Sequence, residues 1–334
     1  MQLAVIILSY NTRDLLRQAL QSVLASAART RDQLVVDVIV VDNASQDGSA
    51  ALVAAEFPQA QLIASPTNLG FTGGNNLALK SLGYAVAAPD CPISLSPHSH
   101  TPDFVLLLNS DAEVQGDALW QMANFLQQQP KAGACGANLQ YGDGRFQHGA
   151  FALPSLFQVA LDFFPLTGVP GAQRLHNSQW NGRYPLAQWQ GTQPFPVDFV
   201  LGAALMVRGT AIQQVGGLDN DFFMYCEEMD WSLRLADAGW GIFAIPTAQV
   251  IHHEGQSSKQ VRWIAYERLW RSRFRFYAKH AAHYPPGYLL WLRLLVRAGL
   301  WSRTRQARAR FARGEITGVA LEAELQAYAH ILAL

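Results

Sequence analysis

The sequence predicts an α/β protein with a mostly parallel, Rossmann-like central sheet flanked by helices, and with a helical extension at its C-terminus. Short apolar, β-rich runs alternate with helical patterns along the first half of the chain. The unbroken apolar run at 104–108 is typical of a parallel strand buried on both faces. The 334 residues, half of them hydrophobic, suffice for one large core and an appendage.

The first half of the chain contains four expected strands, and each of them leads to a helix. The strands are predicted at 3–8, 35–41, 62–64 and 104–108, and the helices at 13–27, 47–57, 74–82 and 117–129. Further strands are predicted at 131–139 and 246–252. We expect an inserted loop at 85–103, which holds four prolines, and loops over 142–196, which are rich in Gly, Pro, Asn and Gln. The alternation predicts right-handed parallel units.

The net charge of zero conceals a strong asymmetry along the chain. Residues 259–334 hold 14 Lys and Arg against 4 Asp and Glu, whereas residues 1–258 hold 11 against 21. We therefore expect a main domain at 1–258 and a basic, aromatic-rich helical extension at 259–334. A basic extension of this kind favours an anionic partner such as a membrane surface. Nucleic acid is not expected as the partner, because the acidic main domain would repel its phosphates. Residues 288–301 are too short and charged to span a bilayer but are typical of an interfacial helix; packing on the main domain is the alternative.

The N-terminus and the cysteines indicate a cytoplasmic protein. The basic extension would place it at the inner face of the cell membrane. The apolar run near the N-terminus has only six residues and no preceding basic residue, so we expect a strand there and no signal peptide. Cys91, Cys135 and Cys226 have no CxxC spacing, which favours neither a disulfide framework nor a zinc site.

Polar residues follow the predicted strands, where open α/β sheets bind their ligands. Asp42 ends its strand too early to cap the next helix, so its carboxylate can accept hydrogen bonds from a base or a ribose; Ser45 and Asp47 are ordinary helix caps. The glycines of "NLGFTGGNN" precede a helix, where backbone amides can approach phosphate or sugar oxygens. We expect the following strand-end groups to converge on one crevice: Ser9, Tyr10, Asn11, Asp42, Asn43, Asn68, Asn109, Ser110 and Asp111.

Two strand ends carry candidate metal ligands. Asp111 follows the buried strand, where a carboxylate is well placed to hold Mg²⁺ or Mn²⁺ against diphosphate oxygens, although a lone Asp also suits a simple turn. His252 and His253 end another strand; a single His is more often structural, but the pair is a candidate for a second ligand.

An acidic pair, Glu227 and Glu228, opens a predicted helix whose apolar stripe is Met229, Leu233 and Ala236. Acidic residues also simply favour the positive end of a helix dipole. The aromatic run "DFFMYC" directly before the pair indicates burial, which raises the pKa of a carboxyl and suits it to act as a base.

Seven runs together resemble the inverting, metal-dependent transferases of glycosyltransferase family 2, in particular its rhamnosyltransferase-like branch. They span about residues 3–257 in the family's order: "VIILSYNT", "VIVVDNASQDGS", "NLGFTGGNN", "LLLNSDAEV", "VLGAALMVR", "VGGLDNDFFMYCEEMDWSLRLADAGW" and "VIHHEG". The resemblance implies a GT-A fold and a divalent cation, Mn²⁺ or Mg²⁺, held by Asp111 and His252. It implies Glu228 as the general base, with Glu227 beside it.

The resemblance also implies the substrates. The donor would be a deoxythymidine- or uridine-diphosphate sugar, deoxythymidine-diphosphate rhamnose among them, and the acceptor a hydroxyl of a glycan or lipid-linked glycan in cell-surface polysaccharide synthesis. The nucleotide-sugar site would comprise Ser9, Tyr10, Asn11, Asp42, Asn43, Asn68, Gly70, Gly74, Asn75, Asn76, Asn109, Ser110, Gly202 and Ala203.

The chain departs from the family pattern at two positions. Asn109 stands where the metal motif often begins with an acid, and Glu227-Glu228 stands where Glu-Asp is usual. These departures leave a catalytically inactive member that binds nucleotide sugars as an alternative. A nucleotidyltransferase, which could share the sheet and the metal, is another.

Overall fold

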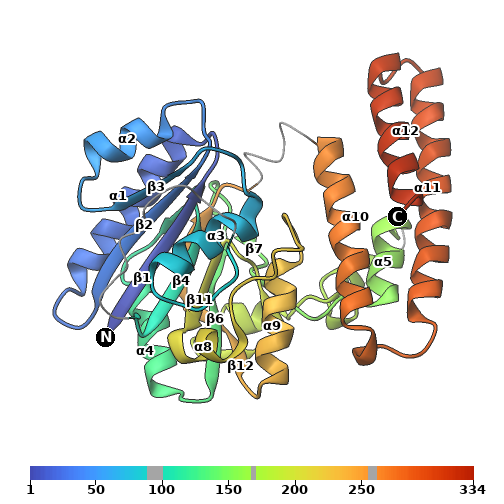
Figure 1. Cartoon of the computed structure of the whole chain (residues 1–334). Coiled ribbons are helices and arrows are strands. Elements are labelled where there is room, and N and C mark those ends of the chain that lie inside the picture. Colours follow the sequence, from blue (N-terminus) through green and yellow to red (C-terminus); the bar gives the residue numbers. More distant parts are fainter. Residues whose placement is uncertain (89–100, 167–170, 255–261) are drawn as a thin grey trace. The chain divides into compact units, whose positions relative to one another are not determined.

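The structure is a computed structural model that describes residues 1–88, 101–166, 171–254 and 262–334 (Figure 1). The chain forms two compact units. The sheet unit comprises Met1–Phe151, Leu186–Phe223 and Glu227–Ser257, and the helical unit comprises Ala152–Pro185, Met224–Cys226 and Ser258–Leu334. The second unit thus takes in a segment from the middle of the chain besides the C-terminal residues.

Ten strands of the described chain form the main sheet of the sheet unit. The pairs β1–β2, β2–β3, β1–β4 and β6–β12 are parallel, which confirms the predicted sheet, whereas β11 lies antiparallel between β4 and β6. The spatial order is β3 (Gln61–Ser65), β2 (Val35–Asn43), β1 (Gln2–Ser9), β4 (Phe104–Asn109), β11 (Ala204–Arg208), β6 (Ala132–Gln140), β12 (Gly241–His252) and β5 (Ala112–Val114). Strands β7 (Phe146–Gln147) and β9 (Phe195–Pro196) pair with β6 and β12, and β8 (Ala150–Phe151) pairs with β10 (Phe199–Val200).

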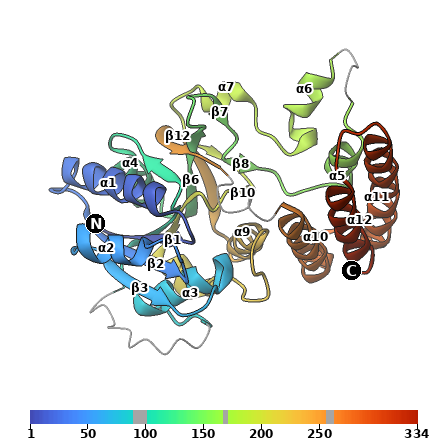
Figure 2. The same ribbon diagram turned by 90° about the horizontal axis from the view of Figure 1, so that it is seen from above.

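Helices cover both faces of this sheet (Figure 2). On one face, α1 (Arg13–Arg29) and α4 (Ala118–Gln128) contact each other, and α1 buries Leu16 and Leu20 in the same core as Val5 and Ile7 of β1. Each such side chain contributes roughly 1.5–3 kcal/mol when fully buried. The other helices of the unit are α2 (Ser49–Glu56), α3 (Gly70–Ser81), α7 (Leu186–Trp189), α8 (Gly209–Val215) and α9 (Glu227–Asp237).

Helix α3 begins four residues before its predicted start, at Gly70. Gly74 therefore lies inside the helix, where a Cβ atom would overlap the side chain of Leu8. Gly70 has a φ of +72°, and a Cβ atom there would overlap the carbonyl oxygen of Phe223. Both glycines are thus explained by close packing of α3, on the sheet face opposite α1.

The helical unit corrects the expectation that residues 142–196 form loops. Helix α5 (Leu156–Phe163) starts at Ser155, whose hydroxyl accepts a hydrogen bond from the backbone N–H of Gln158 at 3.2 Å. Its last residue, Phe163, stacks on Trp270 with ring centroids 5.2 Å apart. The remaining helices are α6 (Ala172–His176), η1 (Gln179–Asn181), α10 (Arg262–Lys279), η3 (Ala281–His283), α11 (Tyr288–Ala312) and α12 (Gly318–Leu332).

Most of the expected loop at 85–103 lies outside the described residues, which omit 89–100.

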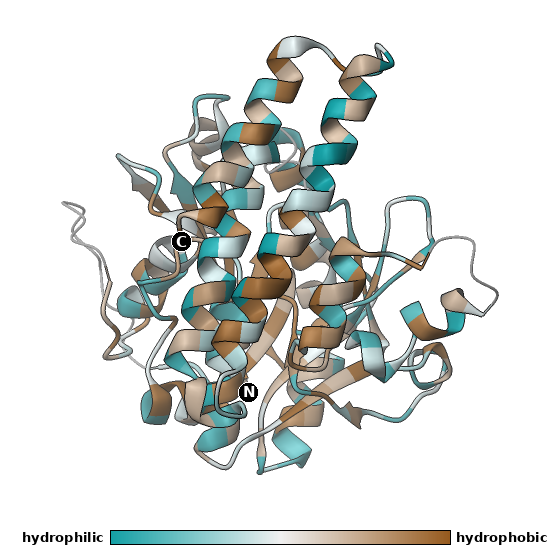
Figure 3. Cartoon of the chain, turned by 90° about the vertical axis from the view of Figure 1, so that its right-hand side faces the viewer, coloured by the Kyte–Doolittle hydropathy of each residue, from teal (hydrophilic) through white to brown (hydrophobic). Residues whose placement is uncertain are grey.

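Hydrophilic and hydrophobic residues alternate along the C-terminal helices (Figure 3). Among the described helices, none is long and apolar enough to cross a membrane.

Candidate active site

The register of the parallel strands brings their polar ends to one edge of the sheet. Ser9 of β1 lies opposite Asp42 of β2, and Leu8 lies opposite Asn109 of β4. The hydroxyl of Thr12 lies 3.2 Å from that of Ser9 and 2.8 Å from that of Ser110, so it links the ends of β1 and β4. This role of Thr12 was not predicted, because its contact partner Ser110 lies 98 residues away in the chain.

Only one of the two carboxylate oxygens of Asp42 makes a hydrogen bond within the described residues. Its Oδ2 accepts a hydrogen bond from the backbone N–H of Ser45 at 3.1 Å. Its Oδ1 is buried without a hydrogen-bond partner among the residues that the structure describes. A buried acceptor left unsatisfied is unfavourable, so this oxygen favours a donor group from a bound molecule. Asn11, with a φ of 52°, fixes the neighbouring loop by accepting from the N–H of Gln46 at 2.7 Å.

Several predicted binding residues make internal hydrogen bonds. The amide of Asn43 donates to Oδ1 of Asn68 at 2.9 Å and to the carbonyl oxygen of Gly70 at 3.1 Å, which fixes the turn into α3. Asn75 donates to the carbonyl of Phe71 at 2.8 Å, and fully buried Asn76 donates to that of Leu218 at 2.8 Å. Ligand contacts by these side chains stay a prediction.

The remaining predicted positions lie around β4 and β11. The backbone N–H of Asn109 donates to the carbonyl of Ala203 at 3.1 Å, which joins the two strands where β4 ends. A Cβ atom at Gly202 would lie 2.9 Å from the ring of Phe71, so the glycine permits this close approach. Tyr10 is exposed and follows β1 directly.

The sheet itself places Asp111 beside His252. Strand β5 pairs antiparallel with β12, with His252 opposite Ala112, and the carbonyl of Asp111 accepts the N–H of His253 at 2.9 Å. As a result, Oδ1 of Asp111 lies 3.4 Å from Nε2 of His252, and both side chains are buried. His253 instead contacts Glu113, with Nε2 and Oε1 at 2.7 Å. The ladder therefore selects His252, and not His253, as the histidine beside Asp111.

Gln147 fixes the orientation of the His252 ring. Oε1 of Gln147 lies 3.2 Å from Nδ1 of His252 and can only accept, so Nδ1 carries the proton. The other ring nitrogen, Nε2, lies 3.3 Å from the side-chain amide nitrogen of Asn109 and is the one that faces Asp111. A ring nitrogen oriented by a buried partner is typical of a metal-binding histidine. Gln147 was not predicted, because it lies in a segment without a recognisable pattern.

The Asp111 and His252 side chains fit a divalent cation. Two ligands bound at about 2.0–2.2 Å and at right or tetrahedral angles lie about 3–3.5 Å apart, as these atoms do. The described chain contains no cluster of three His, Cys, Asp or Glu side chains that could hold a metal.

Burial raises the pKa of both members of the acidic pair at the start of α9. For Glu227 the pKa lies well above 4.5, because the carboxyl is buried and because Glu228 adds a second negative charge. For Glu228, burial raises the pKa to about 7. One oxygen of each carboxyl has no hydrogen-bond partner within the described ranges. Burial and the neighbouring charge thus favour the protonated form of Glu227, whereas Glu228, with a pKa of about 7, can accept a proton near neutral pH.

The rest of α9 holds the pair in place. Asp230 forms an ion pair with Arg234, at 2.8 Å, and the helix is followed by Gly239 at a φ of +89°. The buried stripe differs from the prediction: Ala236 is exposed, and Trp231 and Leu235 are buried. Arg234 also donates to the carbonyls of residues 215 and 217, so this ion pair anchors the preceding loop.

Comparisons with known proteins show the family of this chain. The family model described as glycosyltransferase like family 2 matches residues 1–269. The N-acetylglucosaminyl-diphospho-decaprenol L-rhamnosyltransferase of Mycobacterium tuberculosis is 28% identical over 228 residues, which cover 67% of this chain and 68% of that protein. Rhamnosyltransferase WbbL of Escherichia coli is 36% identical over 88 residues, 25% of this chain and 31% of that one.

Solved structures show the fold. The mannosyltransferase PcManGT of Pyrobaculum calidifontis, in complex with GDP-Man and Mn²⁺, aligns with a TM-score of 0.54 and 17% identity over 99% of this chain and 85% of its own. GalNAc-T7 with UDP, GalNAc and Mn²⁺ aligns with a TM-score of 0.54 and 11% identity, over 83% and 48% of the two chains. The expected GT-A fold is thereby confirmed. Because the family model spans most of the length of this chain, the protein belongs to glycosyltransferase family 2.

Proposed function

We propose that this protein is an inverting, metal-dependent glycosyltransferase that moves a sugar from a nucleoside-diphosphate donor to a hydroxyl of a lipid-linked glycan. The observation that carries the proposal is the buried Asp111–His252 pair, with 3.4 Å between carboxylate and imidazole at the end of the sheet. The names of both bacterial relatives support a rhamnosyl donor, and the name of the Mycobacterium tuberculosis protein supports an acceptor linked to a lipid diphosphate. The nucleotide is deoxythymidine or uridine diphosphate, as the family resemblance implies.

The donor binds along the polar edge of the sheet. Asp42, at the end of β2, accepts a hydrogen bond from the nucleoside through its unsatisfied Oδ1. The linked hydroxyls of Ser9, Thr12 and Ser110 follow at the ends of the neighbouring strands β1 and β4, next to Asp111. A Mn²⁺ or Mg²⁺ ion held by Asp111 and His252 would stabilise negative charge on the diphosphate.

Glu228 activates the acceptor. Its carboxylate takes the proton of the acceptor hydroxyl as that oxygen attacks the anomeric carbon from the face opposite the diphosphate. A new carbon–oxygen bond forms, the bond to the nucleoside diphosphate breaks with its electron pair leaving on the diphosphate, and the anomeric configuration inverts. A pKa of about 7 suits this role at neutral pH. Glu227, whose protonated form is favoured by burial, orients its neighbour.

The test is binding and turnover with a panel of nucleoside-diphosphate sugars, with Mn²⁺ and with excess chelator. We expect one donor to raise the melting temperature most, because a ligand that binds only the native state stabilises it. We also expect release of nucleoside diphosphate from that donor to require the metal. Binding without any turnover on added acceptor would indicate an inactive member, and turnover that persists in chelator would exclude the metal role.

We further propose that α11 lies on an anionic membrane surface. It exposes large apolar side chains together with arginines, a composition typical of interfacial helices. The exposed fractions are 61% for Leu290, 62% for Trp291, 45% for Leu294 and 62% for Trp301. A membrane-bound acceptor would be presented at the same surface.

A further inference from the structure

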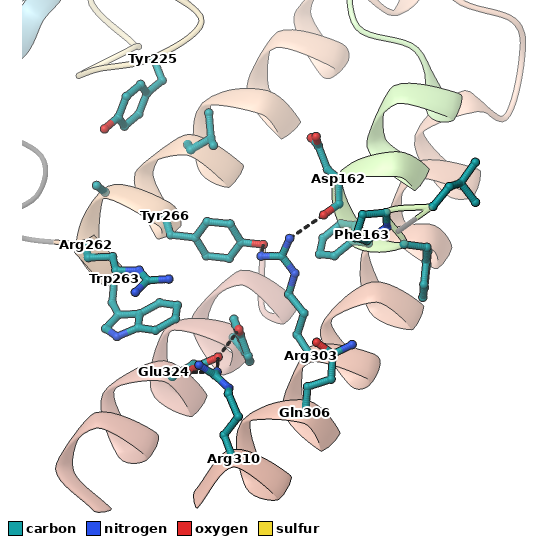
Figure 4. A pocket seen from close by; sticks show the side chains of 16 residues that line it. Asp162, Phe163, Tyr225, Arg262, Trp263, Tyr266, Arg303, Gln306, Arg310 and Glu324 are labelled. Carbon is teal, nitrogen blue, oxygen red and sulfur yellow. Dashed lines mark hydrogen bonds and ion pairs between the residues drawn. The ribbon is translucent and has the colours of Figure 1, made fainter. Parts of the chain in front are cut away.

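The helical unit contains a cavity of about 1080 Å³, formed by α5, α10, α11 and α12 (Figure 4). One part of its wall is aromatic and includes Phe163, Trp263 and Tyr266. The other part is charged, and Arg303 extends into the middle of the cavity from α11 (Figure 4). Sites for small organic ligands are likewise mostly apolar with a few placed polar groups, and they measure about 300–1,000 Å³.

The two acidic side chains of the cavity are both neutralised by arginines. Both oxygens of Glu324 accept hydrogen bonds from Arg310, at 2.7 and 2.8 Å, and Tyr328 donates to the same carboxylate at 2.6 Å. The carboxylate of Asp162 pairs with Arg273 at 2.9 Å. Neither acid is therefore free to neutralise a further cation in the cavity.

Two arginines of the wall remain without a carboxylate partner in the described part of the chain. Arg303 donates to the backbone carbonyl of Asp162 at 2.6 Å and to the hydroxyl of Tyr266 at 3.2 Å, and it lies over the ring of Phe163 at 5.0 Å. Arg262 lies over the ring of Trp263, also at 5.0 Å. Each keeps guanidinium N–H groups for an anion, and guanidinium groups bind phosphate oxygens in a bidentate manner.

An aromatic wall beside two guanidinium groups that have no carboxylate partner among the described residues is the chemistry that binds an amphiphile with a phosphate head and a hydrocarbon chain. We propose that this cavity binds the lipid-diphosphate part of the acceptor. A diphosphate carries more negative charge than the phosphodiester of a membrane phospholipid, which suits the guanidinium groups of Arg303 and Arg262. Tyr225 also lines the cavity and is separated from Glu227 by a single residue in the sequence. The inference rests on the proposed function, since it names the acceptor's lipid as the occupant.

The experiment is calorimetric titration of the full chain with farnesyl diphosphate, farnesol, inorganic diphosphate and phosphatidylglycerol vesicles. We expect farnesyl diphosphate to bind tightest of the soluble probes, and Arg303→Gln to weaken it at least about tenfold, the usual effect of losing a hydrogen bond to a charged group. Arg262→Gln should weaken it as well, and serves if Arg303→Gln does not fold. Arg305→Gln is the matched control, because Arg305 is exposed on α11 and lies over Trp301.

Unchanged affinity for farnesyl diphosphate in both cavity variants would overturn the inference. So would equal affinity for farnesyl diphosphate and inorganic diphosphate. Displacement of farnesyl diphosphate by nucleoside diphosphate would also overturn it, because the probe would then occupy the donor site. Loss of vesicle binding with intact farnesyl diphosphate binding would assign the arginines to phospholipid instead. None of these titrations requires turnover. Failure of the transferase proposal would appear separately, as the absence of donor binding and of nucleoside diphosphate release.

Discussion

Glu228→Gln replaces the carboxylate proposed to act as the base by an uncharged group of the same size. Because burial raises the pKa of Glu228 to about 7, we expect the wild-type kcat/KM to fall as the pH drops below about 7. The variant should lose roughly 10² to 10⁴ in turnover, the usual contribution of a positioned base, while its affinity for the donor is retained. Glu227→Gln should lose less, because glutamine resembles the protonated acid that burial favours at that position.

The same variant should gain stability at alkaline pH. Raising the pKa of a carboxyl from 4.5 to about 7 corresponds to about 3 kcal/mol between its two protonation states. The neutral form is the one the fold favours, so this stability is complete below about pH 4.5 and is lost as the pH rises towards 7. Glutamine stays neutral throughout. The variant should therefore exceed the wild type by up to about 3 kcal/mol near pH 8, and should match it near pH 4.

Donor affinity is measured by titration and turnover by initial rates. The free energy of unfolding is measured by urea unfolding near pH 4 and near pH 8. If Glu228→Gln turned over normally and Glu227→Gln were inactive, Glu227 would be the base. If both variants stayed fully active, the inverting mechanism with a carboxylate base would be wrong. An equal free energy of unfolding for variant and wild type near pH 8 would refute the burial that raises the pKa.

Three further predictions concern the metal, the histidines and the membrane. Asp111→Ala should abolish divalent-dependent turnover and weaken nucleoside diphosphate binding without loss of the fold, measured by initial rates and by titration; full activity would contradict the metal role. His252→Ala should cause a milder loss, and His253→Ala a smaller one still in the same assay, since His253 contacts Glu113; the reverse order would assign the ligand to His253. Replacing Trp291 and Trp301 by Ser should lower cosedimentation with anionic liposomes, and salt should weaken wild-type binding; equal binding would contradict the membrane role of α11.

Much of the sheet unit follows from local patterns. The apolar runs predict β1 to β4 within two residues of their observed ends, because a strand buried on both faces requires a continuous run of apolar side chains. The start of α9 at Glu227 also agrees with its acidic first turn. Local patterns were less reliable where packing overrides propensity: α3 begins earlier than predicted because its glycines fit against Leu8 and Phe223. Helix α5 was missed within a segment whose composition favours loops.

The composition of the candidate site, by contrast, depends on contacts between residues far apart in the chain. Asp111 and Glu228 stand out in the sequence because each follows a run of apolar or aromatic residues. The choice of His252 over its neighbour, however, depends on the β5–β12 ladder, and its ring orientation depends on Gln147, which is 105 residues away. Successive side chains of a strand point to opposite faces, so only the register of the partner strand decides which histidine meets the carboxylate.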